Sequence, residues 1–151
     1  DSMDLWLFQA LVRGGYRPRV VTMEYNMNLP VDANLMQAVD AGHEFDYAFG
    51  ASLRAVATVA KELGYVLVHV VEGLDAVLVR RDLMQGVAIH PLEAWAACCT
   101  NKTVHVIPTP ARVGSLLDYG VFAATGDVGQ AKAAARRYLA DRPYLMTRPA
   151  M

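Results

Sequence analysis

The sequence has few charged residues, only two cysteines and no long apolar run. Charged residues make up 19% of the 151 positions, against about 25% in typical soluble domains. No stretch approaches the roughly 18 consecutive apolar residues of a membrane-spanning helix, and the net charge of -1 creates no overall field that attracts nucleic acid. Cys98 and Cys99 are adjacent, a spacing that strains a disulfide. This favours reduced thiols in an intracellular compartment, an organelle such as a mitochondrion included.

Motifs of several enzyme classes are also missing. No serine stands in a Gly-x-Ser-x-Gly setting, and the four histidines are scattered without the spacing of metal ligands. No Gly-x-Gly-x-x-Gly pattern follows a predicted strand, although such loops hold phosphate-bearing cofactors at helix termini. We therefore predict neither a hydrolase nor a metal site, and no cofactor site that is complete within this chain.

Apolar side chains are in surplus. Hydrophobic residues make up 54% of the chain, and the mean hydropathy is +0.21. The length suggests one domain with a core of moderate size. The extra apolar surface then faces a large buried sheet, a further part of the same domain or a partner, and we expect other protein subunits as partners.

The strongest structural pattern covers residues 64–83. Two runs rich in Val and Leu flank a Glu-Gly-Leu-Asp turn at 72–75, which predicts a β-hairpin because Gly and Asp tolerate the backbone angles of tight turns. Helices are predicted over 4–12 and 48–63 from apolar residues at helical spacing. The apolar run 18–25 is typical of a strand buried on both faces. The fold class is therefore α/β, in the order helix, strand, helix and hairpin.

The remaining segments are predicted from shorter patterns. Residues 27–47 are expected to form a long irregular connection. Short helices are expected over 91–99 and 111–119, a brief strand over 104–107, and an Ala-rich helix over 127–140.

Charge and pattern both change near residue 83. Residues 1–82 carry 7 basic and 11 acidic side chains, a net of -4, whereas 83–151 carry 7 and 4, a net of +3. We therefore divide the chain into 1–83 and a mainly helical C-terminal extension, 84–151.

Polar side chains follow the predicted strand 18–25. Glu24, Tyr25 and Asn26 stand where this strand ends, and ligands of open α/β sheets bind beyond the carboxyl ends of parallel strands. Ser52 stands at the start of the next helix, where it either caps the helix or faces the same crevice. Glu24 and Asn26 also suit capping of the following loop. A ligand site and a set of local caps therefore both stay open.

Five short motifs occur in a fixed order in the first 83 residues. They are Asp-Ser-Met-Asp-Leu-Trp at 1–6, Glu-Tyr-Asn at 24–26, Gly-Ala-Ser-Leu at 50–53, Gly-Tyr at 64–65 and Val-Arg-Arg-Asp-Leu at 79–83. In this order and spacing the chain resembles the carboxyl-terminal half of a class I S-adenosylmethionine-dependent methyltransferase, most closely an FkbM-like member. Ser2 stands where such proteins usually carry Gly. The extension has no counterpart in this resemblance.

The resemblance implies a partial Rossmann-like methyltransferase sheet without its first four strands and its cofactor loop. Asp1 would lie near the cofactor. Glu24 would orient or deprotonate the methyl acceptor, and Tyr25, Asn26 and Ser52 would line the substrate side of the pocket. S-adenosylmethionine would bind only together with an amino-terminal half that this sequence does not contain. The family's fifth strand, here 18–25, pairs with the second strand of the final hairpin, so its other edge would stand open.

Three functions are compatible with these observations. The first is a non-catalytic, methyltransferase-like subunit that acts as a structural or interaction component of a larger assembly. The second is a fragment of an active methyltransferase whose amino-terminal half is not contained in this sequence. The third is contact with RNA or a small anion through Arg136 and Arg137, with Lys132 nearby, on the helix over 127–140. The alternative for these cations is a solvated helix face.

Overall fold

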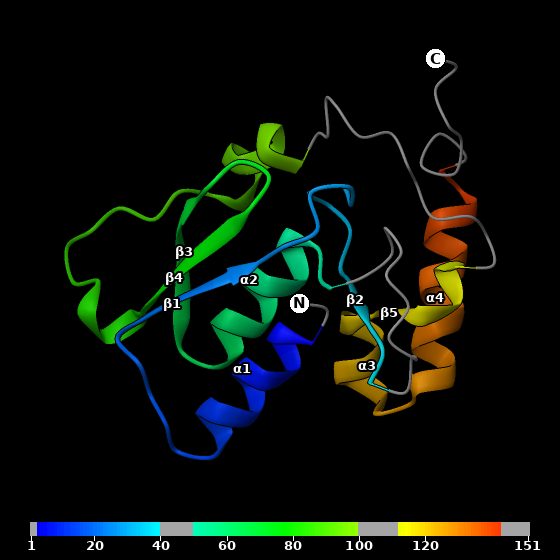
Figure 1. Ribbon diagram of the computed structural model, residues 1–151, viewed down its shortest axis with the longest axis horizontal. Coiled ribbons are helices and arrows are strands. Elements are labelled where there is room, and N and C mark those ends of the chain that lie inside the picture. The colour runs from blue at the N-terminus through cyan, green and yellow to red at the C-terminus, as the bar shows by residue number, and fades with distance from the viewer. Residues whose placement is uncertain (1–2, 40–49, 100–111, 143–151) are drawn as a thin grey trace.

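The computed structural model describes residues 3–39, 50–99 and 112–142 of the chain (Figure 1). Its larger sheet has three strands: β1 (Val20–Glu24), β3 (Tyr65–Val70) and β4 (Asp75–Arg80). They lie in the order β1-β4-β3, and both pairings are antiparallel. The predicted hairpin is therefore confirmed, and the predicted strand over 18–25 pairs with the second strand of that hairpin.

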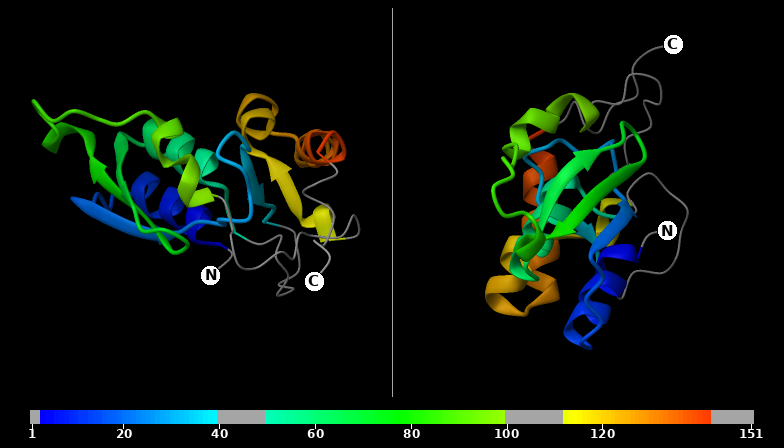
Figure 2. Two further views of the ribbon diagram at one scale, coloured as in Figure 1. Left: turned by 90° about the horizontal axis from the view of Figure 1, so that it is seen from above. Right: turned by 90° about the vertical axis from the view of Figure 1, so that its left-hand side faces the viewer.

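Two helices cover one face of this sheet. They are α1 (Asp4–Arg13) and α2 (Leu53–Glu62), and both lie behind the sheet in Figure 1, as the views of Figure 2 also show. Met23, Ala76 and Leu78 point toward the helices and are buried, since alternate side chains of a strand share one face. Phe8 of α1 meets Tyr65 of β3 with ring centroids 5.1 Å apart. The fold is mixed α/β, as predicted.

β1 is covered on one face only, so the prediction of burial on both faces is wrong. Val20, Thr22 and Glu24 are exposed, whereas Met23 is buried. The reason is that α1 covers one face of β1, and no described strand pairs with the edge that faces away from β4. Val and Thr suit a strand whether one face or two are covered. The sequence pattern therefore did not distinguish an edge strand from a central one.

A second sheet joins segments that are far apart in the sequence. β2 (Leu35–Gln37) pairs antiparallel with β5 (Leu116–Asp118). Two predictions are corrected by this pairing, because the connection over 27–47 contains β2 and the helix expected over 111–119 is a short 3-10 turn followed by β5. Strands of three residues are too short to show an alternating pattern. Each is held as a strand by the backbone groups of the other.

The described part of the extension is mainly helical. Its 3-10 helices are η2 (Leu92–Cys99) and η3 (Arg112–Ser115), and its α-helices are α3 (Tyr119–Thr125) and α4 (Val128–Ala140). The 3-10 helix η1 (Arg81–Leu83) precedes the extension. Asp118 and Asp127 cap α3 and α4 by accepting from the N–H groups of Val121 and Gln130. The strand predicted over 104–107 lies outside the described residues. Among the described helices, none is long and apolar enough to span a bilayer.

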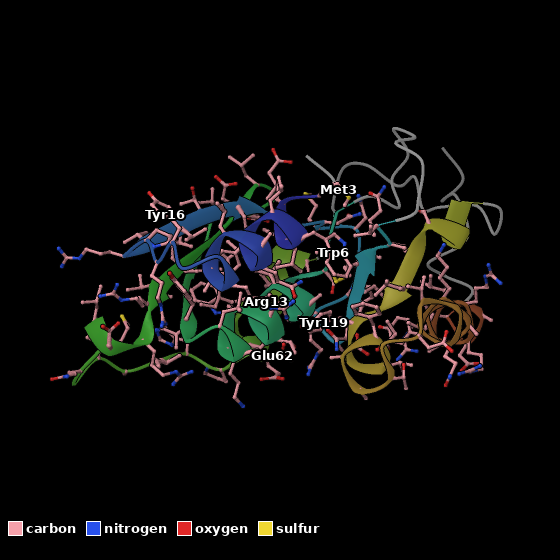
Figure 3. The ribbon with its side chains drawn as sticks, turned by 90° about the horizontal axis from the view of Figure 1, so that it is seen from below. Met3, Trp6, Arg13, Tyr16, Glu62 and Tyr119 are labelled. Atoms are coloured by element: carbon pink, nitrogen blue, oxygen red, sulfur yellow. The ribbon has the colours of Figure 1, made fainter. Side chains whose placement is uncertain are left out.

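Aromatic contacts join the extension to the first part of the chain. Trp6 of α1 meets Phe122 of α3 edge to face, with ring centroids 5.4 Å apart. The Tyr119 hydroxyl donates to the Glu62 carboxylate at 2.6 Å, and Figure 3 shows Arg13, Glu62 and Tyr119 close together. Side chains from both parts belong to one hydrophobic core. The division after residue 83 stays a prediction.

Candidate functional site

A groove of about 480 Å³ lies between α1 and β1. Its apolar walls include Leu7 and Leu11 of α1 together with Val20 of β1. The carboxylic acids Asp4, Glu24 and Asp75 also line it, and no basic side chain is among the lining residues. The groove is therefore apolar along its length and acidic where β1 ends.

Glu24 and Asp75 form the core of this acidic end. They face each other across the β1–β4 pair, and neither has an ion-pair partner among the described residues. Like charges directly opposite on neighbouring strands are destabilising, so this pair favours the approach of a cationic group. Within the described ranges, no group of three or more His, Cys, Asp or Glu side chains could hold a metal ion.

Tyr25 follows Glu24 and turns into the protein. Its hydroxyl donates to the Cys98 carbonyl oxygen at 2.8 Å and accepts from the Gly73 N–H at 3.0 Å. Burial raises the pKa of the phenol to about 12, and the Gly73 hydrogen bond opposes that shift. The phenol therefore stays protonated at neutral pH and links β1, the hairpin turn and η2.

Asn26 is likewise turned inward. Its side chain is 3% exposed, and its Oδ1 accepts from the Asn28 N–H at 2.9 Å. Its backbone N–H donates to the Ala51 carbonyl oxygen at 2.7 Å. This is an Asx turn, in which the side chain replaces a backbone acceptor. The loop-capping alternative is therefore the one that the geometry supports for Asn26.

Ser52 is completely buried and acts as the N-cap of α2. Its Oγ accepts from the Ala55 N–H at 3.2 Å and from the Leu35 N–H at 3.0 Å. Its hydroxyl donates to the Ala33 carbonyl oxygen at 2.5 Å. One donor and two acceptor positions are the full capacity of a hydroxyl. Ser52 therefore caps the helix and fixes the chain before β2, and the crevice alternative is not supported.

Among the described residues, the groove between α1 and β1 does not bring the predicted site residues together. Glu24 borders the groove, while Tyr25, Asn26 and Ser52 make internal hydrogen bonds. Asp1 lies outside the described residues. The assignment of these side chains to a substrate lining stays a prediction.

Several groove residues were missed at the level of sequence. Asp75 was assigned only to the hairpin turn, although the register places it opposite Glu24. Leu7 and Leu11 contributed only to the apolar spacing that predicts the helix over 4–12, yet they are 58% and 53% exposed. The sequence contained a signal for this exposure. Apolar residues surround almost the whole circumference of the helix over 5–12, whereas a helix that packs on one face needs only an apolar stripe.

The two cysteines and His69 also have structural explanations. Cys98 and Cys99 form no disulfide, and burial raises the pKa of Cys99 to about 12, which keeps it unreactive. His69 is exposed on β3, and its ring meets Trp95 edge to face with centroids 5.9 Å apart. His69 therefore lies on a face of the sheet.

Arg136 and Arg137 lie on the outer side of α4. Both are exposed, while Ala131, Ala135 and Leu139 of the same helix are buried. This arrangement is compatible with a solvated face and with an anion-binding patch, so the RNA contact stays a prediction.

Comparisons with protein-family models, curated proteins and solved structures found no match to this chain.

Proposed function

We propose that this chain is a non-catalytic, methyltransferase-like subunit that acts as a structural or interaction component of a larger protein assembly. The observation that carries the proposal is the internal use of Tyr25, Asn26 and Ser52. These residues would line the substrate pocket of an enzyme. A hydroxyl such as that of Ser52, with its capacity filled by the fold, has nothing left to orient a methyl acceptor.

The methyltransferase-like part of the proposal rests on the five sequence motifs. The strand order β1-β4-β3 supports it, because β1 lies beside the second strand of the hairpin and its other edge is unpaired in the described residues. A fold does not by itself assign an activity. The side chains therefore support the absence of catalysis, and the motifs and the strand order support the likeness to methyltransferases.

An active methyltransferase fragment is the second candidate. The observation that favours it is the position of Glu24, which is exposed at the end of β1 and lines the groove beside Asp75. A carboxylate there could orient or deprotonate a hydroxyl or amine acceptor. S-adenosylmethionine would then be held together with a part of the protein that this sequence does not contain.

Calorimetric titration of the native protein with S-adenosylmethionine separates the two candidates. We expect no saturable binding, and we expect the Glu24→Ala variant to enter the native assembly as wild type does. Saturable binding, together with methyl transfer that is lost in Glu24→Ala but kept in Asp82→Ala, would replace the proposal with the enzyme. Asp82 is the matched control because it is an exposed acid paired with Arg80 at 2.7 Å, away from the groove.

Size-exclusion chromatography of native extract is a second test of the proposal. A subunit of a larger assembly should elute from native extract well above the 16.5 kDa of the single chain. Elution as a free chain, with no companion protein, would leave no assembly for it to serve.

A further inference from the structure

Among the described residues, no strand pairs with the outer edge of β1. The hydrogen bonds at its two ends, from the Arg80 N–H to Arg19 at 3.0 Å and from the Tyr25 N–H to Leu74 at 3.3 Å, fix which groups face β4. Residues of an antiparallel pair alternate between facing the partner strand and facing away from it. The backbone groups that point to the free edge are therefore those of Val20, Thr22 and Glu24.

An apolar shelf runs beside this edge. Leu7, Leu11 and Val20 are 58%, 53% and 55% exposed, and all three line the groove between α1 and β1. Edge strands are commonly protected by Pro, Lys or a bulge. Residues 20–24 contain neither Pro nor Lys, and their pairing with β4 has no register shift. Shelf and edge together have the character of an interaction surface.

The two ends of the edge carry opposite charge. Asp4, Glu24 and Asp75 lie where β1 ends, and the exposed Arg19 lies just before it begins. Such a surface is complementary to itself when one copy is turned end for end.

We propose that the free edge of β1 pairs with the same edge of a second copy of this chain, antiparallel and about a two-fold axis at Thr22. Val20 of each copy then lies opposite Glu24 of the other, which gives up to about six hydrogen bonds. Arg19 lies opposite Tyr25 of the other copy. A parallel pairing would instead set the acids of both copies side by side, which like-charge repulsion disfavours.

The same axis also covers the apolar shelf. An axis perpendicular to the sheet keeps both α1 helices on one face, so Leu7 and Leu11 of the two copies meet across it. The result is one continuous sheet in which neither β1 edge is exposed. This inference rests on α1 and β1 and agrees with the proposed structural subunit. In the fragment of an active methyltransferase, a strand of the same polypeptide would instead occupy this edge.

Sedimentation analysis of the full chain over a wide concentration range tests the pairing. We expect reversible dimerisation to twice the 16.5 kDa of one chain, with a dissociation constant on the order of micromolar for so short an edge. Thr22→Pro should raise that constant at least about tenfold, because proline removes a donor from the ladder. Thr22→Val keeps the donor and should dimerise as wild type does.

An added charge tests the antiparallel direction. In that register the side chains of Val20 and of Glu24 from the other copy lie opposite each other on the same face of the sheet, so Val20→Lys should tighten the dimer by about fivefold and Val20→Glu should weaken it by a similar factor. Leu11→Glu leaves β1 unaltered and should also weaken the dimer, so the test does not depend on the proline variant remaining folded. In a parallel pairing Val20 would not lie opposite Glu24, and Val20→Lys would not tighten the dimer.

Hydrogen exchange distinguishes the occupants of the edge. In the dimer, the amides of Val20, Thr22 and Glu24 should be protected, and dilution should release them. A monomer in which these amides exchange freely overturns the proposal. If the protein is a monomer in which these amides are protected, another segment of the same polypeptide occupies the edge. If the dimer forms equally well in Thr22→Pro and Leu11→Glu, self-association uses a different surface. Either result also overturns it.

Discussion

Replacement of Ser52 by alanine should destabilise the fold without touching the groove. The Ser52 hydroxyl is completely buried and holds the N–H groups of Ala55 and Leu35 and the carbonyl oxygen of Ala33. Loss of an N-cap side chain costs about 1 kcal/mol. Each of the two other buried groups left without its partner adds about 1 kcal/mol. The expected loss in the free energy of unfolding is therefore about 3 kcal/mol.

This loss is large compared with the stability of a typical domain, about 5–15 kcal/mol. It corresponds to a fall in Tm of roughly 6–12 °C for a chain of this size. Urea unfolding followed by tryptophan fluorescence measures it, with the m-value expected to stay constant because the surface exposed on unfolding is unchanged.

Thr58→Ala is the matched control on the same helix. The Thr58 hydroxyl donates to the Arg54 carbonyl oxygen one turn earlier at 2.8 Å, a bond that the helix does not need. The higher helix propensity of alanine offsets its loss, so the change should stay within about 0.5 kcal/mol. If Ser52→Ala costs no more than Thr58→Ala, the structural assignment of Ser52 is wrong and the crevice alternative returns.

Two further perturbations test the packing around the hairpin and the extension. The free energy of unfolding should fall between pH 10 and 12. In the folded state, burial is the main cause that raises the phenol pKa values of Tyr25 and Tyr119 from 10.0 to about 12. The unfolded chain therefore loses these protons at lower pH than the folded chain does. Tyr119→Phe should flatten the fall in alkaline urea titrations, and an unchanged slope would contradict this reasoning. Gly73→Ala and Gly86→Ala should each cost about 1 kcal/mol, because both glycines have a φ near +75° and the Met27 sulfur, 2.8 Å from a new Cβ at Gly73, belongs to the end of a flexible side chain that can move aside. A urea midpoint for Gly73→Ala well below that of Gly86→Ala would show that Met27 cannot move.

Local chemistry determined most of the first part of the chain. The Glu-Gly-Leu-Asp sequence at 72–75 predicts the tight turn, and Gly73 indeed has a φ of +73°. The apolar spacing of α1 and α2 predicted both helices, and Asp127 predicted the start of α4. These features depend on neighbours within a few residues, which is the range over which a sequence pattern carries information.

Pairing between distant segments was decided by the tertiary structure. β2 and β5 have three residues each and exist because Leu35–Gln37 meets Leu116–Asp118, which lies far away in the sequence. The sequence placed Glu24, Tyr25 and Asn26 at the end of one strand. It did not determine that the Glu24 side chain is exposed, whereas the Tyr25 hydroxyl forms hydrogen bonds with Cys98 and Gly73.

The sequence by itself thus determined the α/β class, the hairpin and the order of the major helices, because these follow from local propensity and periodicity. Only the tertiary structure decided that Ser52 is a structural cap, that Asp75 faces Glu24, and that no described strand covers the outer edge of β1 beside the exposed leucines. The physical reason is that hydrogen-bond capacity and burial are properties of three-dimensional neighbours. A polar residue in a sequence carries the same groups whether the fold uses them internally or leaves them for a partner.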